Sequence, residues 1–254
     1  MPNHIINNVK ISGDAEDVKK CFETIVKPLE VKDYEGNVSI ETRFSFEHII
    51  PMPKTLHIES GTRTDDGIKL VSGTEKEREE VIAKYKKWFG DGKGKNALDI
   101  ADKRDALDNE LEKVMELGKI ALENQKLYGH KDWYDWSIAN WGTKWDAYEV
   151  SYEYDGGTEM ELNFQTAWST PKPIFDKLTE MFPELSIYIE YADEDWGNNC
   201  GTMLYVNGEM TSWEDGDINF AMGLWGYSPE EIEEEKRRWA EEDAYEDAEE
   251  DGED

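Results

Sequence analysis

Short runs in which apolar and polar residues alternate recur along the chain and predict half-buried β-strands. The clearest pair flanks Asp155-Gly156-Gly157, a turn sequence that tolerates positive φ. The apolar positions of this predicted hairpin are Tyr148, Val150, Tyr152 and Tyr154 in the first strand and Met160, Leu162 and Phe164 in the second. The same alternation predicts further strands at residues 5–11, 38–46, 187–191, 200–206 and 209–213.

Apolar residues spaced three and four apart predict helices between these strands. The first is expected from Asp14 to Val26, with Cys21 on its apolar face as a buried structural thiol. In the second, Thr74 and Glu77 form a capping box.

A longer helix is predicted from Asn96 to Tyr128 and ends at Gly129, and another follows Thr170-Pro171 with Thr170 as its cap. Residues 54–72 are polar and contain glycine, so we predict a loop there. The glycine- and lysine-rich segment 90–95 lacks the strand and the Ser or Thr of a phosphate-binding loop, and is interpreted as a linker between helices.

Together these elements predict an α+β fold, in which an antiparallel sheet carries helices packed on one face. The split β-α-β order favours a ferredoxin-like plan. Four parts are expected: an N-terminal β-α-β part at 1–53, a helical insertion at 54–129, a Trp-rich ferredoxin-like part at 130–227 that shares the sheet, and an acidic helical tail at 228–254.

The Trp-rich stretch from Trp133 to Trp168 is the centre of this plan, because five of the ten tryptophans lie in it. Burying one indole removes roughly 150–250 Å² from water, which favours a role in the core. An aromatic platform that stacks bases or another small ligand is the alternative. The residues of that alternative pocket are Trp133, Trp136, Trp141, Lys144, Trp145, Trp168 and Trp196.

Charge excludes several classes of partner. The chain has 28 Lys and Arg against 59 Asp and Glu, a net charge of −31. Direct binding to nucleic acid or to an anionic membrane needs a cationic surface, so neither is expected. The two cysteines form no disulfide framework, and the chain shows no secretory signal or membrane-length apolar run, so we expect a cytoplasmic protein.

No motif for a reaction, a cofactor or a metal is evident. The four histidines show no zinc spacing, and no nucleophile elbow is present. The acidic segments that begin at Asp193 and Asp215 do not fit a calcium-binding loop. We therefore expect no catalytic residue, no metal and no cofactor.

The C-terminal segment is the most acidic part of the chain. From Pro229 to Asp254 there are 15 acids and three bases, a net charge of −12 over 26 residues. If helical it spans about 39 Å, or roughly one net charge per 3.2 Å, close to the ~3.4 Å of a single nucleic acid strand. Ser228 and Glu231 predict its capping box, and the part beyond Asp243 is expected to be frayed.

Several long segments resemble a known family. MPNHIINNVKISGD, FEHIIPMPK, YGHKDWYDWSIANWGTKWDAY, TAWSTPKPIFDKLTEMFPEL and YADEDWGNNCG together look like phage- and plasmid-encoded proteins with a YubB ferredoxin-like domain. The resemblance covers residues 1–53 and roughly 128–206. It implies a ferredoxin-like shape without iron, and an accessory protein of a mobile element in a bacterial cytoplasm that acts against host defences.

The functional hypothesis is a non-enzymatic interaction protein that binds a basic, nucleic-acid-handling host protein through acidic surface, in the manner of a nucleic acid mimic. The residues expected to contact this partner are Glu230, Glu231, Glu234, Glu235, Glu241, Glu242, Asp243, Asp193, Glu194 and Asp195. The alternative is a protein that binds or sequesters a nucleotide or small molecule in the Trp-rich pocket.

Overall fold

The computed structural model describes residues 2–32, 36–89 and 97–250. The chain divides into two compact units. One unit comprises Met1–Pro51 and Asn140–Asp254 and contains both sheets, and the other comprises Met52–Ala139 and is helical. The expected insertion at 54–129 lies within the helical unit, and the predicted linker at 90–95 lies outside the described residues.

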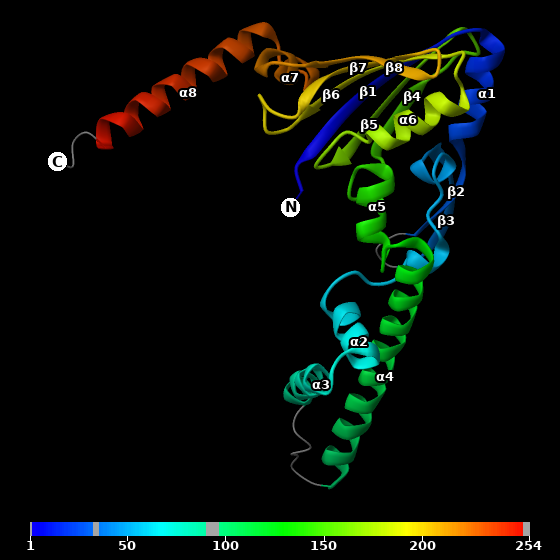
Figure 1. The fold of residues 1–254 in the computed structure, drawn as a ribbon. Helices are drawn as coiled ribbons and strands as arrows, with labels where there is room; N and C mark the ends of the chain where they lie inside the picture. Colours follow the sequence, from blue (N-terminus) through cyan, green and yellow to red (C-terminus); the bar gives the residue numbers. More distant parts are fainter. Residues whose placement is uncertain (1, 33–35, 90–96, 251–254) are drawn as a thin grey trace. The chain divides into compact units, whose positions relative to one another are not determined.

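The first unit is built on a six-stranded antiparallel sheet in the order β4-β5-β1-β6-β7-β8 (Figure 1). Strand β1, from the N-terminal segment, lies between β5 and β6, two strands that follow it by more than a hundred residues. The strands are β1 (His4–Ser12), β4 (Tyr148–Glu153), β5 (Glu159–Ala167), β6 (Ser186–Asp193), β7 (Cys200–Val206) and β8 (Glu209–Asp215).

Helices cover both faces of this sheet to different extents. Helices α1 (Ala15–Ile25) and α6 (Lys172–Met181) pack on the face that carries the apolar core. Helix α7 (Ile218–Leu224) packs on the opposite face at one end, where Ala221 joins Ala192 and Cys200. The prediction that helices lie on one face is therefore wrong at α7, whose sequence was not assigned to any element.

The core beneath the sheet is centred on phenylalanines rather than on indoles. Phe164, 1% exposed, has its ring centroid 5.1 Å from that of Phe44, 5.9 Å from that of Phe46 and 6.4 Å from that of Phe175. Trp141 joins this cluster through Phe46. Of these phenylalanines only Phe164 lies on the six-stranded sheet, at one of the alternate positions of β5 that point to the core face.

The first helix ends earlier than predicted. The chain turns at Val26 into β2 (Val26–Lys32), which pairs with β3 (Val38–Phe44) in a separate two-stranded sheet.

The predicted alternation in β4 also needs correction. In β4 a bulge follows Tyr148, with Glu149 at φ 49°, and it shifts the register by one residue. Tyr148 therefore faces away from the side of the sheet that carries Tyr152.

The segment after the Trp-rich helix is fixed by the carboxylate of a half-buried residue, Asp146. Asp146 accepts hydrogen bonds from Ser45 Oγ at 2.7 Å, from the Phe46 backbone N–H at 2.8 Å and from its neighbour's N–H, that of Ala147, at 2.8 Å. Burial raises the pKa of Asp146, although these donors act in the opposite direction. The contact ties the Trp-rich stretch to the 3₁₀-helix η1 (Phe46–His48).

The helical unit contains a helix where a loop was predicted. It consists of η2 (Lys54–Leu56), α2 (Thr62–Ser72), α3 (Glu75–Phe89), α4 (Ala97–Tyr128) and the start of α5 (Trp133–Trp141). Helix α2 lies within residues 54–72, and Gly67 in its middle does not mark the predicted loop. A Cβ at Gly67 would lie 2.1 Å from the Val114 carbonyl oxygen of α4, so the glycine allows the two backbones to touch.

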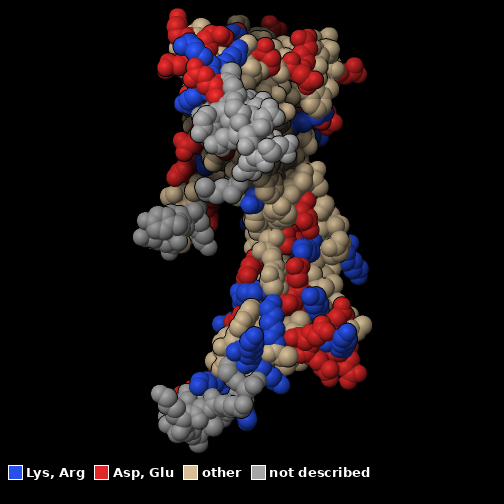
Figure 2. All heavy atoms as spheres, turned by 90° about the vertical axis from the view of Figure 1, so that its left-hand side faces the viewer, with Lys and Arg blue, Asp and Glu red and all other residues tan. Residues whose placement is uncertain are grey.

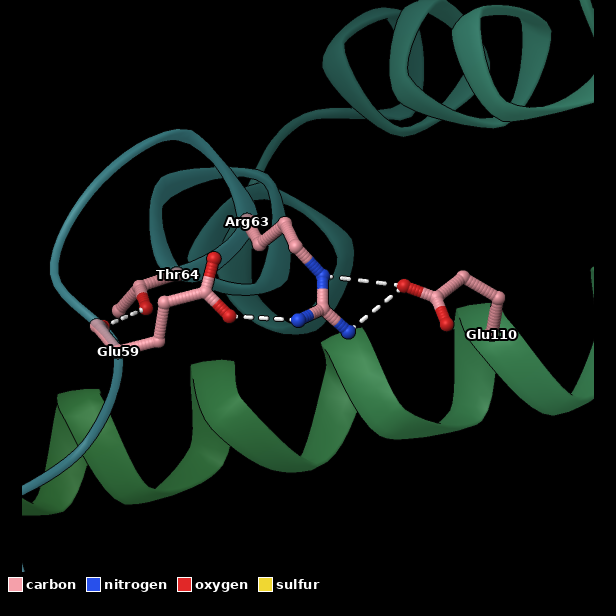
Figure 3. A network of polar contacts seen from close by, with 4 residues as sticks. All are labelled: Glu59, Arg63, Thr64 and Glu110. Atoms are coloured by element: carbon pink, nitrogen blue, oxygen red, sulfur yellow. Dashed lines mark hydrogen bonds and ion pairs between the residues drawn. The ribbon is translucent and has the colours of Figure 1, made fainter. Parts of the chain in front are cut away.

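Arg63 joins the start of α2 to α4 (Figure 3). Its guanidinium donates to Glu110 Oε1 at 3.0 and 2.7 Å and to Glu59 Oε2 at 2.5 Å. Thr64, which is fully buried, donates its hydroxyl to the Glu59 carbonyl oxygen. Figure 3 shows the guanidinium held between the two carboxylates, so this network has a structural role.

Helix ends follow the predicted chemistry at α3 and α4 but not at α1 or α6, since the side chain of Asp14 makes no cap hydrogen bond to α1. Thr74 and Glu77 form the predicted capping box of α3, and Gly129 follows α4 at φ 78°. Thr170, however, donates its hydroxyl to Asn7 Oδ1 at 2.8 Å and does not cap α6. Asn7 lies in the centre of the sheet with no exposed surface, so its amide oxygen needs a donor within the protein. The Thr170 hydroxyl supplies that hydrogen bond instead of capping the helix.

The C-terminal helix α8 (Pro229–Glu250) extends further than the predicted frayed end at Asp243. Ile232 is 7% exposed, and the rings of Trp239 and Trp196 lie 5.8 Å apart. These apolar contacts fix the first turns of α8 to the loop after β6.

Both cysteines are free and buried, and burial was predicted for Cys21. Burial raises the pKa of Cys21 to about 12. Among the described helices, none has the length and apolarity needed to cross a membrane.

Candidate functional site

The strand register places polar side chains in rows across the face of the sheet opposite the core. Residues directly opposite each other on paired strands share a face. The first row is Glu153, Glu161, Lys10, Tyr188, Leu204 and Ser212. The second row is Ser151, Asn163, Asn8, Glu190, Thr202 and Glu214. Every one of these residues is exposed or half-buried, and we call the two rows with the adjoining Glu159 the open face.

The open face is strongly acidic. It carries five carboxylates, those of Glu153, Glu159, Glu161, Glu190 and Glu214, and the single ammonium of Lys10. Lys10 Nζ lies 2.6 Å from Glu159 Oε1 and 4.0 Å from Glu161 Oε1. The hydrogen bond to Glu159 raises the pKa of Lys10, so the ammonium stays charged. Four carboxylates in excess remain on the face.

Two adjoining depressions lie along this surface. One, of about 200 Å³, is lined by Asn8, Val9, Lys10, Glu161, Asn163, Tyr188 and Glu190. The other, of about 540 Å³, follows the β4–β5 turn and includes Glu153, Asp155, Glu159 and Glu161. Glu161 lines both. The open face is therefore a hollowed, acid-lined surface.

Tyr188, on β6, is the aromatic residue among those that line the smaller depression. Its side chain is 37% exposed, and its hydroxyl donates to Glu190 Oε1 at 3.3 Å. Partial burial and the charge of Glu190 raise the pKa of Tyr188, so the phenol stays protonated. Its cross-strand neighbours are Lys10 on β1 and Leu204 on β7.

The residues predicted for the alternative pocket are divided between the two units. Trp133 and Trp136 belong to the helical unit, and Trp141 and Trp196 belong to the other. Trp141 is buried and donates Nε1–H to the Ile50 carbonyl oxygen at 2.9 Å. Trp196 packs on Tyr227, with ring centroids 4.9 Å apart.

Three of those residues do meet in the sheet unit. Lys144 Nζ lies 4.6 Å from the Trp145 ring centroid and 4.9 Å from that of Trp168. Trp168 is 40% exposed, and its backbone is held by Asn3 and Asn199. The chain's own lysine thus stacks on the two indoles, which stabilises the surface without defining a ligand site.

Asp193 is not available to a partner, which corrects its assignment to the partner-binding set. It is 6% exposed, and its carboxylate accepts hydrogen bonds from Asn3 Nδ2, from the Asp195 N–H and from Asn199 Nδ2 at 2.9–3.1 Å. Glu194 is exposed but accepts from the His4 backbone N–H at 2.9 Å. The loop folds around these carboxylates because they satisfy its N–H groups.

The acids predicted in α8 have mixed roles. Glu231 accepts from the Ser228 N–H and hydroxyl at 2.8 Å, and these hydrogen bonds lower its pKa. Glu235 pairs with Arg238. Besides Glu231, the acids of the set that are exposed on the described part of α8 are Glu230, Glu234 and Glu241. Glu242 and Asp243 lie outside the described side chains.

Acids and bases are interspersed on the face of the molecule that Figure 2 shows. There, lysine and arginine side chains lie among the acids, which do not gather into one continuous band. The described residues also bring together no group of three or more His, Cys, Asp or Glu placed to hold a metal ion.

The fold and the open face define an α+β protein with a ferredoxin-like sheet. Residues 140–242 match the model of a family described as ferredoxin-like domain in Api92-like protein. Among solved structures, the crystal structure of protein api92 from Yersinia pseudotuberculosis is similar at 13% identity and a TM-score of 0.41, covering 85% of this chain and 98% of that chain. No curated protein matches.

The family match confirms the expected ferredoxin-like domain over these residues. It refers to Api92-like proteins, so the YubB name and a phage or plasmid origin stay expectations. The residues of the open face were missed as a site. The alternation of wet and apolar positions marks them strand by strand, but only the register joins them across six strands.

Proposed function

We propose that this protein is a non-enzymatic interaction protein that binds a basic partner through the open face of its sheet. The observation that carries the proposal is the charge of that face, with five carboxylates around one ammonium that is itself paired with Glu159. Charge complementarity steers a cationic surface to such a face and excludes anionic ones.

The same charges argue against RNA as the ligand of the sheet. Ferredoxin-like RNA-binding sheets stack bases on exposed aromatic rings. Here Tyr188 offers one ring, but Glu161 and Glu190 line the same depression. Phosphates would meet net repulsion, because binding to a nucleic acid backbone depends on its neutralisation by Lys and Arg.

Proteins that handle nucleic acids carry basic clefts, and we propose a partner of that class, such as a host defence protein. The exposed acids of α8, Glu230, Glu234 and Glu241, add a second acidic element to the sheet unit. In this proposal the open face provides the shaped contact and α8 adds long-range attraction.

A defined basic probe tests the proposal. We expect a fluorescein-labelled peptide of eight arginines to bind the full chain, with an affinity that falls as salt rises. The double variant Glu161→Gln/Glu190→Gln is expected to weaken this binding about tenfold, which is about 1.4 kcal/mol. Fluorescence anisotropy measures the affinity.

The matched control is Glu16→Gln/Glu23→Gln, which removes the same charge from exposed positions on α1. It is expected to change affinity less than about twofold, because distant surface charges are screened. Equal losses in the two double variants would show that only net charge matters, and would contradict a role for the open face.

A further inference from the structure

The smaller depression, lined in part by Tyr188, has the chemistry of a binding pocket for one cationic side chain, and we call it the seat. Resting on the proposed function, we propose that it receives an arginine of the basic partner, with the guanidinium stacked on the Tyr188 ring and bonded to Glu190 and Glu161. In this proposal the depression recognises the guanidinium group itself, in addition to attracting positive charge.

The side chains that line the depression supply acceptors around an aromatic face. Glu161 and Glu190 contribute carboxylates, and Asn8 and Asn163 contribute carboxamides, whose oxygens are acceptors. Within the part of the chain that the structure describes, no hydrogen bond joins either of these amides to another group of the protein. Their oxygens are thus open to an incoming N–H donor.

The local cation lines the depression but is held at its β5 side. Lys10 lies on β1 between β5 and β6, and its ammonium is bonded to Glu159 Oε1 at 2.6 Å and lies 4.0 Å from Glu161 Oε1. Tyr188 and Glu190 lie on β6, on the other side of β1. Glu190 meets the Tyr188 hydroxyl at 3.3 Å, a long contact that leaves most of the carboxylate's acceptor capacity unused.

Arginine fits this arrangement better than lysine does. A guanidinium is planar, stacks on an aromatic ring and presents five N–H donors in a fixed fork. An ammonium is a compact, strongly hydrated charge that gains less from a ring and from in-plane acceptors. A seat with one ring, two carboxylates and two amide oxygens should therefore distinguish the two cations.

Two peptides of equal length and charge test the seat, one of eight arginines and one of eight lysines. We measure the ratio of their affinities for the full chain, for Tyr188→Ala, for Tyr188→Phe and for the control Tyr128→Ala, an exposed tyrosine at the end of α4. The wild-type chain is expected to prefer the arginine peptide by about fivefold. Tyr188→Ala should bring the ratio close to one, and Tyr188→Phe and Tyr128→Ala should keep it.

An unchanged ratio in Tyr188→Ala would overturn the seat, and so would the absence of a preference in the wild-type chain. If either result accompanies a selective loss in Glu161→Gln/Glu190→Gln, the open face still binds the basic probe and only the arginine seat fails. If that double variant behaves like its α1 control, the proposed function fails as well.

Discussion

Replacement of Gly118 by valine is expected to lower the free energy of unfolding by about 3 kcal/mol or more. A Cβ at Gly118 would lie 2.1 Å from the Gly67 carbonyl carbon and 2.2 Å from the Gly67 oxygen. Both are backbone atoms of α2, so no side chain can move aside, and α2 and α4 must separate. Separation would expose the cluster that includes Leu70, Val81 and Val114.

Urea unfolding followed by circular dichroism measures this loss, and hydrogen exchange of α2 and α4 locates it. Gly223→Ala is the control, because a Cβ there meets nothing within 4 Å in helix α7. It should leave stability unchanged or raise it by up to about 1 kcal/mol. A Gly118→Val protein that unfolds at the wild-type urea concentration would show that α2 does not pack on α4 as described.

Phe164→Ala is expected to cost about 3–5 kcal/mol of unfolding free energy. Phe164 is 1% exposed and contacts the rings of Phe44, Phe46 and Phe175, so its removal leaves a cavity on the core face of the sheet. Guanidinium unfolding monitored by tryptophan fluorescence provides the measurement.

The larger aromatic Trp168 serves as the comparison. Its side chain is 40% exposed, and the Lys144 ammonium lies 4.9 Å from its ring centroid. Trp168→Ala should therefore lower the free energy of unfolding by about 1 kcal/mol or less. A larger loss for Trp168→Ala than for Phe164→Ala would restore the original expectation that the indoles of the Trp-rich stretch hold the core together.

Local patterns determined much of the fold in advance. Alternation at Met160, Leu162 and Phe164 marked the buried face of β5, and all three are 1–3% exposed. The capping boxes at Thr74 and Ser228 marked the starts of α3 and α8. These features depend on residues within a few positions of each other, which is why one sequence suffices to find them.

Features that depend on distant contacts were missed. Helix α2 contains Gly67, and glycine has a low helix propensity. The glycine is needed there because the backbone of α4 leaves no room for a side chain, and that contact cannot be predicted from local sequence. Thr170 has a good cap side chain, but buried Asn7 competes for its hydroxyl from β1. The bulge after Tyr148 has no signal in the alternating pattern that it interrupts.

The same distinction applies to the candidate site. The wet positions of each strand could be identified one strand at a time, including Glu159 and Glu161 in the predicted hairpin. These residues share a face with Glu190 and Asn8 because the strands pair in the order β5-β1-β6. A local sequence pattern does not contain this strand order. Asp193 was assigned to the partner surface on its charge, and its burial against Asn3 and Asn199 followed only from the fold.

The most direct test is to map where a basic probe lies on the protein. We would titrate the isotope-labelled full chain with the eight-arginine peptide and follow backbone and side-chain amide signals by NMR. The central claim predicts that the largest shifts fall on β1, β5 and β6, with the side-chain amides of Asn8 and Asn163 and the ring of Tyr188 among them. Shifts confined to α8, or to Lys144, Trp145 and Trp168, with the open face unchanged, would contradict it.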